Sequence, residues 1–289
     1  MFDRESLLEL IRRAATDLPQ DVEAALCKAA KLEDQPAARF ALDSIIKNIA
    51  LARQMDTPMC QDTGTPIFYI DHPSGLSTLH MRRTIHNALR EATSRGHLRP
   101  NAVHAISGEN SGNNIGGDHF PLIHFSEWDQ PHTSIALMLK GGGSENVSAQ
   151  YSLPDRTQGA GRDLDGVRRV VLDAVQKAQG KGCPPGIVGV GIGGDRATSY
   201  LIAKKALLRR LDEPHPDSQL NELEKVLLAQ INELGIGPMG FGGKTTVLGV
   251  KVDAAYRLPA SYFVSISTMC WACRRWRMTV IDGEVSYTS

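Results

Sequence analysis

Residues 186–211 read GIVGVGIGGDRATSYLIAKKALLRRL, and this stretch decides the class of the fold. Its first seven residues are apolar or glycine, as in a buried strand, and Gly193 and Gly194 supply a turn. The residues after Asp195 have the apolar spacing of a helix. A strand, a turn and a helix in direct succession are typical of mixed α/β proteins.

The same patterns extend in both directions from this stretch. Before residue 119 the apolar spacing predicts helices, and after it strands and helices alternate. The expected helices cover 7–15, 21–33, 38–55, 78–96, 166–179 and 220–235, the last closed by Gly235, and the expected strands cover 120–125, 133–139, 245–252 and 261–268, followed by a hairpin that turns at Asp282-Gly283. We therefore expect one mixed α/β domain over residues 1–289, with a helical N-terminal region and a mixed β-sheet core.

The composition excludes several classes of protein. Hydrophobic residues make up 42% and charged residues 22%, as in an ordinary globular protein. The 32 basic and 32 acidic residues cancel, so no global field indicates nucleic acid or an anionic membrane as a partner. No run reaches the roughly 20 apolar residues of a membrane span, and MFDRESLLEL lacks the pattern of a signal peptide. We expect a cytoplasmic protein.

The segment PMCQDTGTP, residues 58–66, places a thiol in a polar turn. Cys60 has three possible roles there: half of a disulfide, a nucleophile or a metal ligand. Five cysteines are an odd set, and disulfides are rare in the cytoplasm, so the disulfide is disfavoured. A nucleophile needs an orienting histidine that the sequence does not place. The roles of nucleophile and of metal ligand both stay open at this point.

Thiols in similar surroundings recur far along the chain. Cys183 precedes two prolines, and Cys270 and Cys273 form a C-x-x-C pair before an arginine cluster. No second pair is present to complete a zinc site. Together, Cys60, Cys183 and Cys270 are one thiolate short of filling a four-iron cluster, which would leave one iron as a Lewis acid. Cys27 lies in a predicted helix, where we expect a buried structural thiol.

Four glycine-rich segments have a composition that is compatible with ligand loops. GVGIGGD (189–195) departs from the dinucleotide fingerprint, and GPMGFGGKTT (237–246) has a proline where a phosphate loop needs its first glycine, so a nicotinamide-dependent dehydrogenase is only an alternative. KGGGSEN (140–146) and GENSGNN (108–114) combine glycines with polar side chains, as functional loops do.

Six motifs occur in the order CQDTGTP, GENSGNN, KGGGSEN, CPPGIVGVGIGGD, GIGPMGFGGKT and CWACRR. In this combination the chain closely resembles the class I (iron–sulfur) fumarase and L(+)-tartrate dehydratase family, from about Cys60 to Arg275. The match is to the N-terminal domain, which forms the separate α subunit in two-subunit members.

The resemblance implies a hydro-lyase that adds or removes water at a C4 dicarboxylate, either fumarate/malate or L-tartrate/oxaloacetate. It implies a [4Fe-4S] cluster held by Cys60, Cys183 and Cys270, with Cys273 outside the ligand set. It also implies a catalytic role for Asp62, and contacts to the substrate from Gln61, Arg99, Gly142 and Gly143.

Two further expectations follow from the resemblance. The family's second domain or β subunit supplies catalytic residues, so we expect a β subunit as partner, in an α2β2 assembly or with a homodimer of α. Relatives commonly carry histidine where Leu258 stands, and leucine neither transfers a proton nor donates a hydrogen bond. This difference leaves open another dicarboxylate, or an iron–sulfur binding or sensing protein without turnover.

Overall fold

The computed structural model describes residues 2–289 and confirms the mixed α/β class with helices first along the chain. The chain divides into two compact units. Unit 1 comprises residues 2–20, Lys47–Gly142 and Arg274–Ser289. Unit 2 comprises Asp21–Ile46 and Gly143–Cys273. The expected single domain over residues 1–289 stays a prediction. None of the helices within residues 2–289 combines the length and apolar character needed to cross a bilayer.

Unit 1 contains a five-stranded mixed sheet in the order β2-β1-β3-β8-β9. The strands are β1 (Thr65–Pro73), β2 (Leu122–Trp128), β3 (Thr133–Lys140), β8 (Arg275–Ile281) and β9 (Glu284–Thr288). Only β1 and β2 are parallel, and α4 (Thr78–Ser94) lies between them in the chain, as a parallel pair requires. The β8–β9 hairpin turns at Asp282 and Gly283, as predicted.

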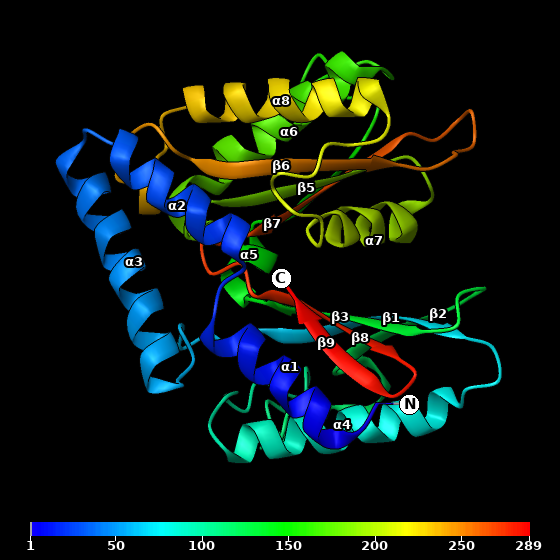
Figure 1. The fold of residues 1–289 in the computed structure, drawn as a ribbon. Helices are drawn as coiled ribbons and strands as arrows, with labels where there is room; N and C mark the ends of the chain where they lie inside the picture. Colours follow the sequence, from blue (N-terminus) through cyan, green and yellow to red (C-terminus); the bar gives the residue numbers. More distant parts are fainter. Residues whose placement is uncertain (1) are drawn as a thin grey trace. The chain divides into compact units, whose positions relative to one another are not determined.

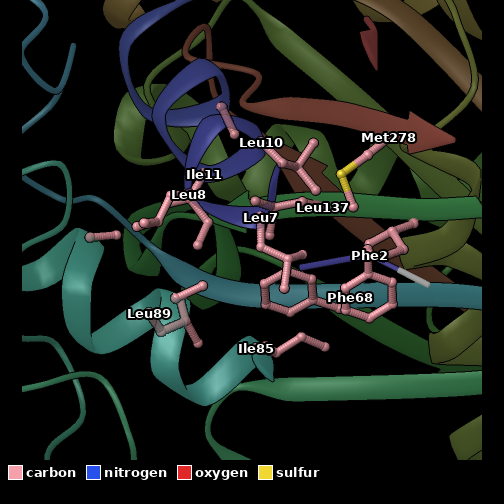
Figure 2. Close-up of a cluster of buried hydrophobic side chains, with 14 of the residues drawn as sticks. Phe2, Leu7, Leu8, Leu10, Ile11, Phe68, Ile85, Leu89, Leu137 and Met278 are labelled. Atoms are coloured by element: carbon pink, nitrogen blue, oxygen red, sulfur yellow. The ribbon is translucent and has the colours of Figure 1, made fainter. Parts of the chain in front are cut away.

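One hydrophobic cluster holds unit 1 together. The helix α1 (Arg4–Thr16) turns its apolar face inward, and Asp3 caps its first turn. Figure 2 shows Leu7 and Ile11 of α1 close to Phe68 and Leu137 of the sheet, with Ile85 of α4 beside them; all are fully buried. Both helices therefore cover the same face of the sheet.

Unit 2 contains a four-stranded sheet in the order β4-β7-β5-β6. The strands are β4 (Ala149–Ser152), β5 (Gly186–Ile192), β6 (Val247–Ala254) and β7 (Phe263–Met269). Figure 1 shows α6 (Leu164–Ala178) and α8 (Ser218–Glu233) over one face and α7 (Arg196–Ala206) against the other. The remaining helices are α2 (Gln20–Leu32), α3 (Pro36–Met55), α5 (Gly142–Asn146), η1 (Gly117–His119), η2 (Gln179–Gly182) and η3 (Pro238–Gly240).

The glycines of β5 let α7 approach the sheet closely. A Cβ on Gly189 would lie 2.1 Å from the carbonyl oxygen of Ala203, and one on Gly191 would lie 2.1 Å from that of Ser199. The Ser199 hydroxyl donates to the Gly191 carbonyl oxygen at 3.1 Å across this contact. Helix–strand packing thus explains the motif that suggested a dinucleotide site, and the sequence reason for a dehydrogenase is removed.

Two further details differ from the sequence analysis. It did not predict β1, although residues 66–70 are buried in the middle of the sheet, because prolines at positions 66 and 73 obscure the strand pattern. It expected a buried Cys27, whereas Cys27 lies in α2 as predicted but is half-buried. The glycine after α8 is confirmed, since Gly235 has a φ of +66° just beyond the helix.

We expect Gly191→Ala to lower the free energy of unfolding by about 2–3 kcal/mol, because the added methyl group meets rigid helix backbone. Gly249→Ala on the neighbouring strand β6 is the matched control. Its Cβ would meet only the flexible tip of Leu211, 2.5 Å away, so the loss stays below about 1 kcal/mol. Urea unfolding followed by circular dichroism measures both; equal losses would contradict the packing explanation.

Candidate functional site

The turn that carries Cys60 is fixed at both ends within unit 1. Met59 is buried, its N–H donates to the Ala15 carbonyl oxygen at 3.1 Å, and its own carbonyl oxygen accepts from Asn48 Nδ2 at 2.7 Å. At the other end Gly64 has a φ of +80°, and a Cβ there would lie 2.8 Å from the Lys140 carbonyl carbon. Cys60 is therefore presented, half-buried, on a rigid turn outside the core.

An ionised carboxylate supports the segment just before this turn. Asp56, with a φ of +51° at the end of α3, accepts from Arg12 Nη1 at 2.9 Å and lies 3.2 Å from His97 Nε2. The hydrogen bond from Arg12 holds the pKa of the Asp56 carboxyl below its ordinary value, and His97 acts in the same direction. The end of α3 is thus tied to α1.

Asp62 uses both carboxylate oxygens to hold backbone. Its Oδ1 accepts from the Gly64 N–H at 3.0 Å and its Oδ2 accepts from the Gly142 N–H at 2.8 Å. Its carbonyl oxygen accepts a short hydrogen bond from Arg274 Nη1. The sequence analysis predicted a catalytic Asp62, and the structure shows that it also joins the Cys60 turn to the first residue of α5.

Gly141 and Arg274 complete this arrangement; the sequence indicated Arg274 only as part of an arginine cluster and Gly141 only as part of KGGGSEN. A Cβ on Gly141 would lie 3.2 Å from Asp62 Oδ2 and 3.3 Å from Arg274 Nη2, so only glycine fits without displacement. Arg274 is 1% exposed, and its Nε has no hydrogen-bond partner within residues 2–289. A buried guanidinium with an unused donor beside Asp62 favours an anion as the ligand of this region.

Gln61 and Arg99 are neighbours on the surface of unit 1. Arg99 Nη1 lies 3.5 Å from the Gln61 carbonyl oxygen, which is at the limit for a hydrogen bond, and both residues are exposed. Their side chains are therefore available to a ligand, as predicted for substrate contacts. No local sequence pattern places these two residues side by side; only the family resemblance groups them, as contacts to the substrate.

Asn114 and Thr63 fix the backbone of Arg99 from both sides. The Arg99 N–H donates to Thr63 Oγ1 at 3.1 Å, and its carbonyl oxygen accepts from Asn114 Nδ2 at 2.8 Å. Asn114 is 1% exposed, has a φ of +60°, also bonds Thr93, and accepts from the Asn101 N–H at 2.9 Å. Asn114, the last residue of the GENSGNN motif, thus positions the backbone of Arg99. The composition of the motif had indicated a functional loop without assigning this role.

In unit 2 the backbones of Cys183 and the Cys270–Trp271 segment adjoin. The Trp271 N–H donates to the Cys183 carbonyl oxygen at 3.1 Å, and Cys183 and Cys270 are half-buried and form no disulfide within residues 2–289. Cys183 has a φ of +52°, an unusual conformation for a side chain other than glycine or asparagine. Residues in sparsely populated backbone conformations are enriched at functional sites. Cys273, by contrast, is fully buried.

Gly142 and Gly143 begin α5, and both are exposed. A Cβ would meet only ordinary contacts, 3.7 Å from Asp62 Oδ2 at Gly142 and 3.6 Å from the Lys181 carbonyl oxygen at Gly143. The Gly142 N–H is already used by Asp62. Their approach to a substrate therefore stays a prediction, with Gly143 as the better placed donor.

The residues predicted to bind the cluster have suitable chemistry. None of Cys60, Cys183 and Cys270 forms a disulfide in the described part of the chain, and iron–sulfur clusters are held by cysteine thiolates. Within residues 2–289 the structure gathers no three histidine, cysteine, aspartate or glutamate side chains into a site for a metal ion. The three-thiol cluster site thus stays a prediction. Leu258 lies 74% exposed in the loop after β6.

Comparison with known proteins decides the family. A family model described as "Fumarate hydratase (Fumerase)" matches residues 4–279. The chain belongs to this family. The resemblance predicted from the six motifs is thereby confirmed.

Three relatives show how this fumarate hydratase family chain compares in length. It is 47% identical over 275 residues to "Putative fumarate hydratase class I" of Geobacillus stearothermophilus, covering 94% of this chain and 53% of that protein. It is 39% identical to "Putative L(+)-tartrate dehydratase subunit alpha" of Methanocaldococcus jannaschii, covering 93% and 94%. It is 31% identical to "L(+)-tartrate dehydratase subunit alpha" of Escherichia coli K12, covering 92% and 86%. The chain spans about half of the first relative and most of the others.

We expect Asn114→Ala to lower the free energy of unfolding by about 2–4 kcal/mol, because it removes three buried hydrogen bonds at a positive-φ position. Asn113→Ala is the control, since within residues 2–289 the Asn113 side chain accepts only the Ile115 N–H, at 3.0 Å, while the Asn113 backbone N–H donates to Ser111 Oγ at 3.5 Å. Its loss stays near 1 kcal/mol. Thermal and urea unfolding measure both, and a loss at Asn114 no larger than at Asn113 would contradict the role assigned to Asn114.

Proposed function

We propose that the chain is the α subunit of an iron–sulfur hydro-lyase that adds or removes water at a C4 dicarboxylate. The observation that carries this proposal is the fixed turn of unit 1 that presents Cys60, with Gln61 and Arg99, which suit a carboxylate ligand, exposed beside it. The relatives named class I fumarate hydratase and L(+)-tartrate dehydratase subunit alpha support the same reaction class.

The proposed ligands of a [4Fe-4S] cluster are Cys60, Cys183 and Cys270. When bound, the cluster supplies an iron that acts as a Lewis acid on the substrate hydroxyl. The buried donor of Arg274 beside Asp62 suits the negative charge of a thiolate-bound cluster or of a carboxylate. Cys273 is buried and stays outside the ligand set.

The chain's own residues bind and orient the substrate. Arg99, with its backbone fixed by Thr63 and Asn114, neutralises one substrate carboxylate, and Gln61 lies next to it. Each Asp62 oxygen accepts one backbone N–H and keeps a second lone pair, with which it orients the departing or entering water. The Gly143 N–H is the backbone donor to the substrate.

The base that removes the proton next to the second carboxylate belongs to a partner chain in this proposal. Relatives of similar length are named α subunits, and the Geobacillus relative is about twice as long as this chain. We therefore propose a β subunit as partner, in an α2β2 assembly or with a homodimer of α.

Anaerobic reconstitution with iron and sulfide tests the cluster ligands. We expect about four irons per chain and charge-transfer absorbance in the wild type. Cys60→Ser, Cys183→Ser and Cys270→Ser each lose this stoichiometry, whereas the controls Cys27→Ser and Cys273→Ala keep it. Circular dichroism confirms folding of each variant. A Cys60→Ser protein that binds the full cluster would remove Cys60 from the ligand set.

Absorbance of fumarate, with malate or fumarate as substrate, tests the reaction. We expect turnover when the reconstituted chain is combined with the co-expressed product of the adjacent gene, with tartrate as the second substrate tried. A reconstituted pair that turns over none of these acids would contradict the proposal and favour an iron–sulfur binding protein.

Substitution of Arg99 tests the carboxylate contact. Loss of one charge-assisted hydrogen bond costs about 1.5–3 kcal/mol, so we expect Arg99→Met to lower kcat/KM by about 10- to 150-fold. Arg95→Met is the control, because Arg95 is exposed and, within residues 2–289, pairs only with Glu91 of the helix α4 that it follows, at 2.9 Å. Steady-state kinetics of the reconstituted pair decides between them; similar losses would exclude a specific role for Arg99.

A further inference from the structure

The helix α5 is too short to hold its own position. It has five residues, Gly142–Asn146, and isolated helices shorter than about 12 residues are marginal in water. Its first two residues are glycines, which add backbone freedom. Neighbouring groups must therefore fix the place of Gly143.

Backbone contacts in unit 2 supply the first part of this support. Ser144 is 2% exposed, and its carbonyl oxygen accepts from Thr268 Oγ1 at 2.7 Å and from Ser148 Oγ at 3.0 Å. The Thr268 N–H also donates to Ser148 Oγ at 3.3 Å. Since Thr268 belongs to β7, the carbonyl one residue after Gly143 is attached to the sheet.

An ion pair supplies the second part. Lys204 Nζ lies 2.5 Å from Glu145 Oε1, and the side chains are 17% and 39% exposed. Lys204 Nζ also lies 5.7 Å from the centre of the Tyr200 ring, within range of a cation–π contact. A mostly buried lysine paired at this distance is better placed than the usual exposed pair to contribute to stability.

The lysine itself stands on a rigid element. Lys204 follows Ala203, whose carbonyl oxygen packs against Gly189, and α7 packs on β5 and β7. Ser265 Oγ on β7 donates to Ser199 Oγ at 2.9 Å and ties the helix to the same sheet as Thr268. The two supports of α5 are therefore mutually fixed within unit 2.

We propose that Lys204 is a positioning residue, which acts through Glu145 and together with Thr268 to hold the Gly143 N–H in place for the substrate. This inference rests on the proposed function, because it takes the backbone of Gly143 as a substrate contact. It assigns a role to the glutamate of KGGGSEN, which lies outside the residues predicted to touch the substrate.

Hydrogen–deuterium exchange of the full chain tests the support without any need for activity. We expect amides of residues 142–148 to exchange about 5- to 30-fold faster in Lys204→Met, as for a local loss of one or two kcal/mol. Lys205→Met is the matched control, since Lys205 is the exposed neighbour on the same helix. Glu145→Gln is the second variant, in case Lys204→Met unfolds. Unchanged exchange in both variants would overturn the inference.

Kinetics of the reconstituted pair tests the positioning. We expect KM to rise about 5- to 30-fold in Lys204→Met with kcat nearly unchanged, because the Gly143 N–H binds the ground state and the transition state alike. Lys204→Arg restores KM, because it keeps the positive charge beside Glu145. An active wild type with identical KM in Lys204→Met would overturn the role of Lys204. A wild-type pair without turnover would instead overturn the proposed function and the positioning role with it, while the exchange result decides the support of α5 by itself.

Discussion

The close approach of α7 to β5 is the constraint on which the rest of unit 2 depends. Gly189 and Gly191 leave room for the helix backbone, and any Cβ at either position would overlap a helix carbonyl oxygen. This contact fixes where the residues of α7 project, and Lys204 is one of them. A requirement of packing in the core thus sets the position of a polar contact at the proposed site.

In unit 1 a single carboxylate has the comparable role. Asp62 collects N–H groups from Gly64 and Gly142, while Arg274 bonds its carbonyl oxygen. Asp62 therefore joins its own turn to two segments distant in sequence, to Gly142 through its side chain and to Arg274 through its backbone. Because each oxygen retains a lone pair, structural support and contact with a substrate are compatible in the same residue.

The sequence predicted most of what local patterns determine. The helices of more than ten residues, the hairpin at Asp282 and Gly283 and the family all followed from periodicity, turn chemistry and motifs, whereas the short α5 did not. What it missed depends on tertiary context. The strand β1 was hidden by its prolines, and the roles of Asn114 and Gly141 arise from groups that only folding brings near them. A motif names the residues of a site, but only the fold separates those that touch a ligand from those that hold them.

At Cys183 the left-handed backbone conformation favours a residue other than cysteine, whereas the proposed chemistry requires the thiol. Glycine or asparagine occupies such a conformation with less strain, so a chain optimised for folding alone would carry one of them at this position. Neither offers a sulfur atom. The thiol is retained at a thermodynamic disadvantage, and a screen for more heat-resistant variants would therefore tend to replace the very atom that the proposed catalysis needs.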